Sequence, residues 1–252
     1  PHNLLHAKGG CVVPTIFADS TDGRIVNFRG SGASWSTVRD GGTGTNASST
    51  LTAQSTAVSV VGATSGGGYY AVVRSFFSFD VSGITSTVAS ATLNLRGVST
   101  NSGDVILIKA SKPDGSNLAT ADFDALPGFS AGNTMSGNVT DYSSEVTSWS
   151  TSGYNSITLN STALSDLASL SSFIVALVEF DHDYSNVAPA QDGTFHRVGL
   201  YYSDNSGTSF DPYIDYTLAP TGYANNVNGV SSANIGNVIG VATADIDKIN
   251  GV

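Results

Sequence analysis

The C-terminal residues 227–252 contain a short repeat. A four-residue unit recurs at intervals of eleven residues, as Val227–Val230, Val238–Val241 and Ile249–Val252. Each unit places Val or Ile beside a Gly, and a unit this small cannot bury its apolar side alone. Its copies must therefore stack on one another or on another chain. The repeat predicts assembly rather than catalysis.

The composition of the repeat favours short strands and turns. An eleven-residue period also suits a right-handed helical supercoil, but Gly and β-branched residues weaken helices. A disordered tail is the remaining alternative, because few of these residues are charged or aromatic. The regular spacing of Val and Ile argues against disorder. The residues expected to mediate oligomerisation or docking are Val227, Val230, Ile235, Val238, Val241, Ile246, Ile249 and Val252.

The composition of the whole chain indicates an all-β protein. Only 12% of the residues are charged, 28 are Gly, and Ser and Thr occur in nearly every segment. Such a mixture favours strands and turns over helices. The formal net charge of −10 opposes contact with a phosphate backbone, so we expect no nucleic-acid partner. No run reaches the roughly 18 to 20 apolar residues of a membrane span, so we expect no membrane insertion.

The first ten residues lack the apolar centre of a secretory signal peptide. We therefore expect a protein made in the cytoplasm. A secreted protein whose signal has been removed would begin in the same way, so an extracellular location stays open. The single cysteine, Cys11, allows no internal disulfide, and stability must come from packing or oligomerisation.

Residues 69–81 are the strongest predicted strand. Alternation of side chains places Phe77 and Phe79 on one face, which we expect to lie in the core. Arg74 and Asp80 share the opposite face but lie about 20 Å apart along a strand. Each must therefore find a partner on a neighbouring strand or loop.

The remaining strands and helices are predicted in an order typical of a sandwich or jelly roll. We therefore predict an all-β jelly-roll β-sandwich with short helical plugs, an N-terminal arm and a C-terminal β extension. The expected domains are an arm with the first strands (1–40), the jelly-roll sandwich (41–218) and the repeat tail (219–252). Further strands are expected at 12–17, 24–29, 88–96, 104–110, 155–160, 173–180, 194–202 and 213–218, and helices at 141–149 and 163–170.

Residues 69–252 also carry a family resemblance. The segments Arg74–Asp80, Ala89–Leu95 and Asp211–Tyr216 follow one another in this order. The order resembles the Arg, Phe and Asp pattern of jelly-roll modules in carbohydrate-binding and cell-surface proteins. With Glu179–Pro189 and the repeat tail included, the chain is also similar to proteins encoded by tailed bacteriophages, whose structural proteins carry comparable tails.

The resemblance implies a non-enzymatic bacteriophage virion structural protein. It would serve as a capsid decoration, head fibre or tail component, displaying the sandwich and assembling through its termini. The expected partners are copies of the same chain, in a homotrimer, and other virion proteins, with host-surface glycans as a further partner. The protein would be made in the host cytoplasm and located in the virion. A secreted carbohydrate-binding or adhesin module is the alternative.

Two common motifs of catalysis are absent from the sequence. It contains no His-Glu-x-x-His and no Gly-x-x-x-x-Gly-Lys pattern. A glycosidase would need two carboxylates about 5 to 10 Å apart, and the sequence indicates no such pair. The cluster around His182, with His196 nearby in the sequence, could suggest acid–base work, but a loop hydrogen-bond network is the stronger interpretation.

Two further groups of residues are candidate binding sites. Asp181, Asp183 and Asn186 offer oxygen ligands of the kind that calcium accepts, so a structural calcium is the one cofactor considered. Trp35 and Tyr202 could stack on a sugar ring, although packing inside the domain is the stronger interpretation for tryptophan. His2 and His6 could hold a stray metal ion, or belong to a flexible arm.

Overall fold

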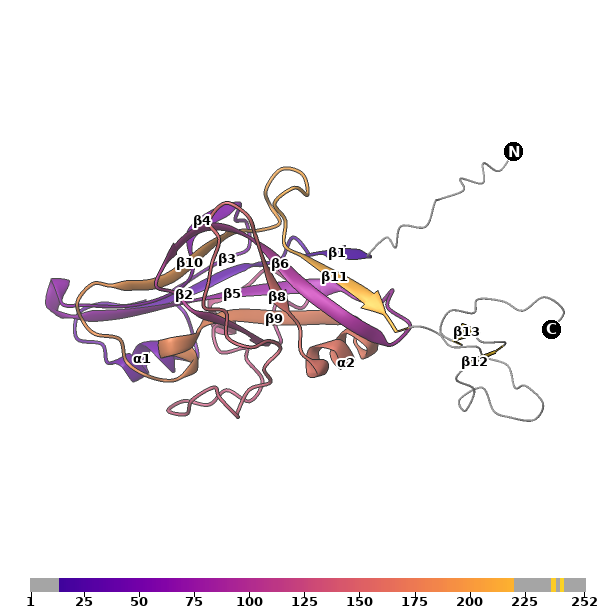
Figure 1. The fold of residues 1–252 in the computed structure, drawn as a ribbon. Helices are drawn as coiled ribbons and strands as arrows, with labels where there is room; N and C mark the ends of the chain where they lie inside the picture. The colour runs from indigo at the N-terminus through magenta and orange to yellow at the C-terminus, as the bar shows by residue number, and fades with distance from the viewer. Residues whose placement is uncertain (1–13, 220–236, 239–240, 243–252) are drawn as a thin grey trace. The chain divides into compact units, whose positions relative to one another are not determined.

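The computed structural model describes residues 14–219, together with 237–238 and 241–242 (Figure 1). Strands dominate these residues and helices are short, so the all-β class predicted from the sequence is confirmed. None of the described helices has the length and apolar character needed to cross a membrane. The finer jelly-roll topology stays a prediction.

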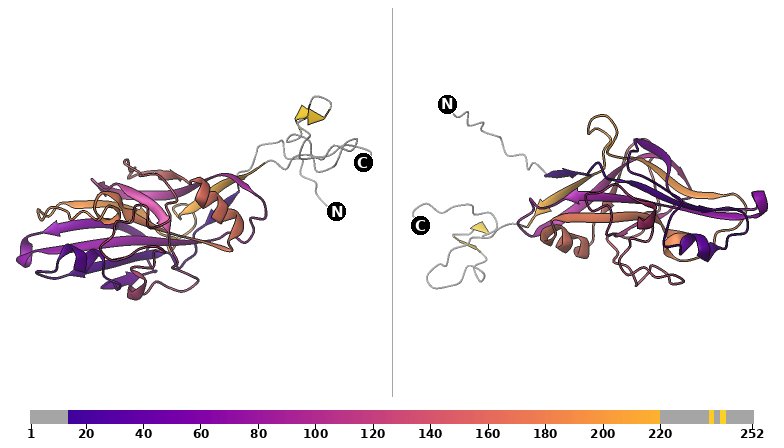
Figure 2. Two further views of the ribbon diagram at one scale, coloured as in Figure 1. Left: turned by 90° about the horizontal axis from the view of Figure 1, so that it is seen from below. Right: turned by 180° about the vertical axis from the view of Figure 1, so that it is seen from behind.

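The strands pack in two layers and run lengthwise through the sandwich (Figures 1 and 2). One layer contains, in order, β7 (Val105–Lys109), β9 (Ser172–Glu179), β5 (Tyr69–Asp80), β2 (Gly23–Arg29) and β3 (Asn46–Ser48). The other contains β8 (Tyr154–Thr158), β6 (Val88–Asn101), β11 (Tyr213–Leu218) and β1 (Thr15–Phe17). The layers are joined by β4 (Ala53–Ala63), which pairs with β5, and β10 (Phe195–Tyr201), which pairs with β4 and β6.

The main core lies between the two layers. Phe77 and Phe79 of β5 are fully buried there, as the alternation of the sequence predicts. They pack with apolar residues of the facing layer, including Leu93 and Leu95 of β6. The predicted helix 163–170 is confirmed as α2 (Ser161–Ser169), and its apolar side belongs to the same core.

A second core covers the other face of β5. Val72 and Phe76 are buried on that face. The cover comes from α1 (Trp35–Arg39) and from the long connection between β7 and β8, which includes the short 3₁₀ turn η2 (Thr120–Asp122). Another 3₁₀ turn, η1 (Ser65–Gly67), joins β4 to β5. Because both faces of β5 are buried, polar side chains on this strand need partners inside the protein.

Residues 141–149 do not form the helix that we predicted. The backbone N of Tyr142 donates to the carbonyl of Leu107 (2.8 Å), and Val146 and Val105 exchange two backbone hydrogen bonds (2.8 and 3.1 Å). The hydroxyl of Ser143 also accepts from the backbone N of Leu107 (3.1 Å). The segment is extended because it completes the edge of β7, and this pairing outweighs its local helical pattern.

The chain divides into two compact units, Pro1–Thr217 and Leu218–Val252. This boundary lies one residue before the predicted end of the sandwich. The predicted boundary at residue 40 has no counterpart, because β2 pairs with β5 along its whole length. In the second unit, β12 (Asn237–Val238) and β13 (Val241–Ala242) pair antiparallel, with Val238 opposite Val241. This part of the repeat is a small hairpin.

Candidate functional site

A single turn of π-helix, η3 (Phe180–Tyr184), follows directly on β9. Turns of this kind are rare and often lie at functional sites. Glu179, the last residue of β9, caps the turn. Its Oε2 accepts from the backbone N of His182 (2.8 Å) and of Asp183 (3.1 Å). The buried carboxylate of Glu179 therefore holds the backbone of His182 and Asp183 in place. It thereby determines the directions in which these two side chains leave the turn.

The side chain of Asp183 points into the second core. Arg74 of β5 donates from Nε to Oδ2 (2.8 Å) and from Nη2 to Oδ1 (2.7 Å), and both side chains are fully buried. The sequence predicts a partner for Arg74 on a neighbouring strand or loop, and the partner lies in η3, the turn that follows the neighbouring strand β9. Two parallel bonds to a carboxylate are the strongest arrangement available to an arginine.

Arg39 of α1 joins this network. Its Nε donates to the carbonyl oxygen of Asp183 (2.9 Å), and its Nη1 donates to Asp40 (2.6 Å) and to the carbonyl of Asn133 (2.7 Å). The guanidinium of Arg74 also lies over the ring of Phe123, 4.1 Å from its centroid. The network thus connects β5, α1, η3 and the connection between β7 and β8. Its role is to hold the second core together.

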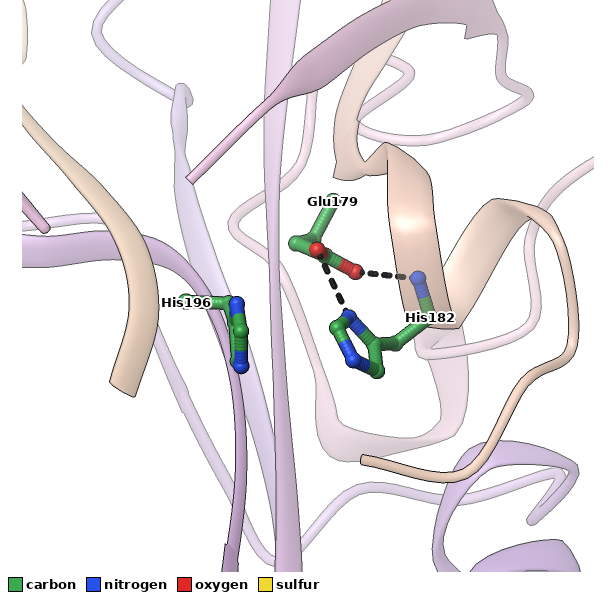
Figure 3. A group of neighbouring side chains, drawn as sticks. All are labelled: Glu179, His182 and His196. Atoms are coloured by element: carbon green, nitrogen blue, oxygen red, sulfur yellow. Dashed lines mark hydrogen bonds and ion pairs between the residues drawn. The ribbon is translucent and has the colours of Figure 1, made fainter. Parts of the chain in front are cut away.

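His182 leaves η3 on the other side and meets His196 of β10 (Figure 3). The centroids of the two imidazole rings lie 4.3 Å apart, with the planes tilted by 42°. The Nδ1 of His182 lies 3.0 Å from Oε1 of Glu179, and the Nδ1 of His196 lies 3.2 Å from the carbonyl oxygen of Ser102. The histidines that the sequence placed near one another are therefore neighbours in space, and Glu179 completes the group.

The surroundings of His182 shift its pKa upward. Burial by itself lowers the pKa of His182, but the hydrogen bond with Glu179 and the charges of Glu179 and Asp181 raise it above its ordinary value. Three carboxylates, those of Asp104, Glu145 and Asp181, form a second group with ligand atoms within 4.8 Å of one another. Burial and mutual repulsion raise the pKa values of Asp104 and Glu145.

The calcium site predicted from Asp181, Asp183 and Asn186 is wrong. Both carboxylate oxygens of Asp183 accept bonds from Arg74, and its side chain is fully buried. The side chain of Asn186 accepts from Nε1 of Trp35 (3.1 Å) and donates to the carbonyl of Gly132 (2.9 Å). Asp181 is exposed and belongs to the separate carboxylate group. Their spacing in the sequence suggested that the three residues bind one ion together. The π-turn instead directs their side chains to different surroundings.

The two predicted glycan contacts pack against other parts of the protein. Tyr202 is fully buried, stacks on Phe77 and shares a hydrogen bond with Ser75 (2.5 Å), so its predicted role in glycan contact is wrong. Trp35 is half-buried against the second core and lies edge-on to Tyr70. The packing interpretation of Trp35 is therefore the one that the structure supports.

Of the residues predicted to mediate assembly, Val238 and Val241 are paired in the hairpin of β12 and β13. Val227, Val230, Ile235, Ile246, Ile249 and Val252 lie outside the described residues, as do His2 and His6. The sequence did not single out Glu179 or Arg39. A Glu three residues before a His was the available signal for Glu179, whereas nothing local marked Arg39 as buried.

A groove of about 420 Å³ lies on another part of the sandwich, lined by residues 143–148 and 156–160. Hydroxyl groups are frequent along it, and none of the described lining residues is aromatic. It therefore lacks the flat ring on which a sugar could stack. Comparison with models of known protein families and with curated proteins found no match to this chain.

Proposed function

We propose that this protein is a non-enzymatic structural component of a bacteriophage virion. It displays the β-sandwich and is held in place by the segments at its two ends. The support comes from the family resemblance, from the repeat, and above all from where the chain enters and leaves the sandwich.

The first and last strands of the sandwich, β1 and β11, lie side by side. β1 and β11 pair antiparallel, with Thr15 opposite Asp215, so the segments before Pro14 and after Leu218 attach side by side (Figure 1). The backbone N of Asp19 donates to the carbonyl of Ser78 (2.8 Å), which places this edge beside the C-terminal end of β5. The other end of β5, at Tyr69, is nine residues from Ser78, about 30 Å at roughly 3.3 Å per residue. Anchoring through both segments would leave that distant end free for display.

The repeat hairpin supports assembly through the tail. A two-stranded hairpin alone is marginal in water, since it cannot bury its apolar side chains. Val238 and Val241 form a cross-strand pair that another copy of the chain would cover. A homotrimer, in which three tails pack together, is the assembly that we propose.

We expect the full-length chain to be a trimer, and replacement of Val238 and Val241 by Asp to convert it to monomers. Two buried charges would remove the apolar contact between tails without touching the sandwich, which has its own core. Light scattering coupled to size-exclusion chromatography gives the mass directly. Val187→Asp, at a valine of the sandwich that is 55% exposed, is the matched control and should stay trimeric. A monomeric wild-type chain would contradict the proposed assembly.

A separate experiment tests whether the protein is part of the virion: mass spectrometry of phage particles purified by density. A stoichiometric ratio to the major capsid protein is expected for a virion component, and its value distinguishes a decoration from a fibre present in few copies. Absence from particles, with the chain found among secreted proteins, would favour the alternative of a carbohydrate-binding or adhesin module.

A further inference from the structure

The histidine pair lies where three segments of the sandwich converge. His182 belongs to η3 and His196 to β10, and the segment from Ser102 to Asp104 runs between them. The carbonyl of Asp104 accepts from the backbone N of Phe180 (2.9 Å). Gly103 makes the convergence possible, because a Cβ at this position would lie 2.6 Å from the backbone N and O of Arg197. The position of the two rings is thus determined by backbone packing rather than by chance at a mobile surface.

Among the residues that the structure describes, each imidazole has a partner for one ring nitrogen, Nδ1, and none for the other. A carbonyl oxygen only accepts, so the Nδ1 of His196 carries the proton that it donates to Ser102. The Nδ1 of His182 faces a carboxylate oxygen of Glu179 and donates in the same way. In the neutral rings the lone pair therefore lies on Nε2. Histidines that ligate metals almost always donate their other N–H to a carboxylate or a backbone carbonyl, and these two rings have one of each.

Glu179 is a suitable supporting carboxylate. Its side chain is fully buried, and two backbone N–H groups already hold Oε2, whereas His182 is the partner of Oε1. One ligand atom from each of Glu179, His182 and His196, with either ring nitrogen serving for a histidine, lies within 4.8 Å of the other two. A buried negative charge behind an imidazole strengthens its donation to a cation. The side chain of His182 is 14% exposed, so an ion from solution can reach the pair.

We propose that His182 and His196 bind a divalent transition metal ion through their Nε2 atoms, with Glu179 orienting His182. Imidazole nitrogen selects zinc, copper or nickel over calcium and magnesium, which prefer oxygen. Zn²⁺ is the ion that we assign, with water completing its coordination. This site is independent of the proposed virion role.

The test uses the full-length chain with His2→Ala and His6→Ala, which leaves His182 and His196 as the two remaining histidines. Titration calorimetry with zinc chloride should show one Zn²⁺ per chain. Nuclear magnetic resonance of the ¹⁵N-labelled imidazoles should show that zinc shifts the Nε2 signals of both rings. Unchanged ring signals at saturating zinc would overturn the proposal.

Single substitutions in the same background locate the ion. His196→Gln should abolish the binding, and Glu179→Gln should weaken it about 10- to 100-fold, the usual effect of removing an orienting partner. Glu145→Gln is the matched control from the neighbouring carboxylate group and should bind as the parent does. Circular dichroism verifies that each variant is folded. Since His196 is only half-buried, its replacement leaves the core intact. Undiminished zinc binding by His196→Gln, or its loss in Glu145→Gln, would refute the assignment.

Discussion

Replacement of Asp183 by Ala should lower the free energy of unfolding by about 3–5 kcal/mol, the usual cost of breaking a buried ion pair. The substitution leaves the guanidinium of Arg74 fully buried without the carboxylate that accepts two of its hydrogen bonds. The carbonyl groups of Phe123 and Arg39 would still accept from Arg74, but they carry no full negative charge. Urea denaturation followed by circular dichroism measures the change.

Asp181→Ala is the matched control for this prediction. Asp181 lies two residues away in the same turn, but it is exposed. Its replacement should change the free energy of unfolding by less than about 0.5 kcal/mol, as is usual for surface positions. Equal effects of the two substitutions would show that the pair of Arg74 and Asp183 does not hold the second core together.

Replacement of Asp22 by Asn should stabilise the protein at pH 8 and remove a fall in stability between pH 4 and pH 8. Asp22 is fully buried, and its carboxylate accepts from the hydroxyl (2.7 Å) and the backbone N (3.0 Å) of Ser203. Burial raises the pKa of Asp22 to about 7, despite the hydrogen bonds from Ser203, which lower it. Asn has the same shape as Asp. It therefore keeps a hydrogen-bond partner for the hydroxyl and for the backbone N of Ser203, and it carries no charge.

The sign of this effect follows from proton binding. Since the folded-state pKa lies above the ordinary value of 3.8, the folded protein binds more protons than the unfolded chain between about pH 4 and pH 7. The stabilising contribution is complete below pH 4 and is lost as the pH rises through 7. A difference of about three pKa units corresponds to about 4 kcal/mol.

Denaturation by urea at several values between pH 4 and pH 8 measures this loss. The wild-type protein should lose stability relative to Asp22→Asn as the pH rises, with most of the difference developed by pH 8. Asp114→Asn, at a half-exposed surface carboxyl paired with Lys112, should keep the fall of the wild type. A difference between wild type and Asp22→Asn that is constant across this range would contradict a buried proton on Asp22.

Patterns of alternation predicted β5 correctly but left β4 unrecognised. In β5 the large residues Phe77 and Phe79 recur at every second position, and this periodicity is visible in the sequence alone. Residues 53–63 of β4 are mostly small or polar, and Val58, Val60 and Val61 are the only large apolar residues among them. β4 is a strand because β5 and β10 flank it on its two sides.

The candidate site was predictable only in part. The sequence indicated that His182 and His196 lie close along the chain and that Arg74 needs a partner. It could not identify that partner, because Asp183 is 109 residues away from Arg74. Nor could it predict that one π-turn directs Asp183 inward and His182 toward β10, since the two residues are neighbours with similar local context.

The sequence by itself determined the all-β class, most strand positions and the repeating apolar pattern of the tail, because these depend on composition and on periodicity along the chain. The tertiary structure alone decided which polar side chains are buried and what they contact. The partner of Arg74 and the burial of Tyr202 depend on elements that are distant in sequence and adjacent in the sandwich. The pairing of the two histidines depends on how η3 packs beside β10. Contacts across such distances leave no local pattern, so they become visible only when the sheets are packed.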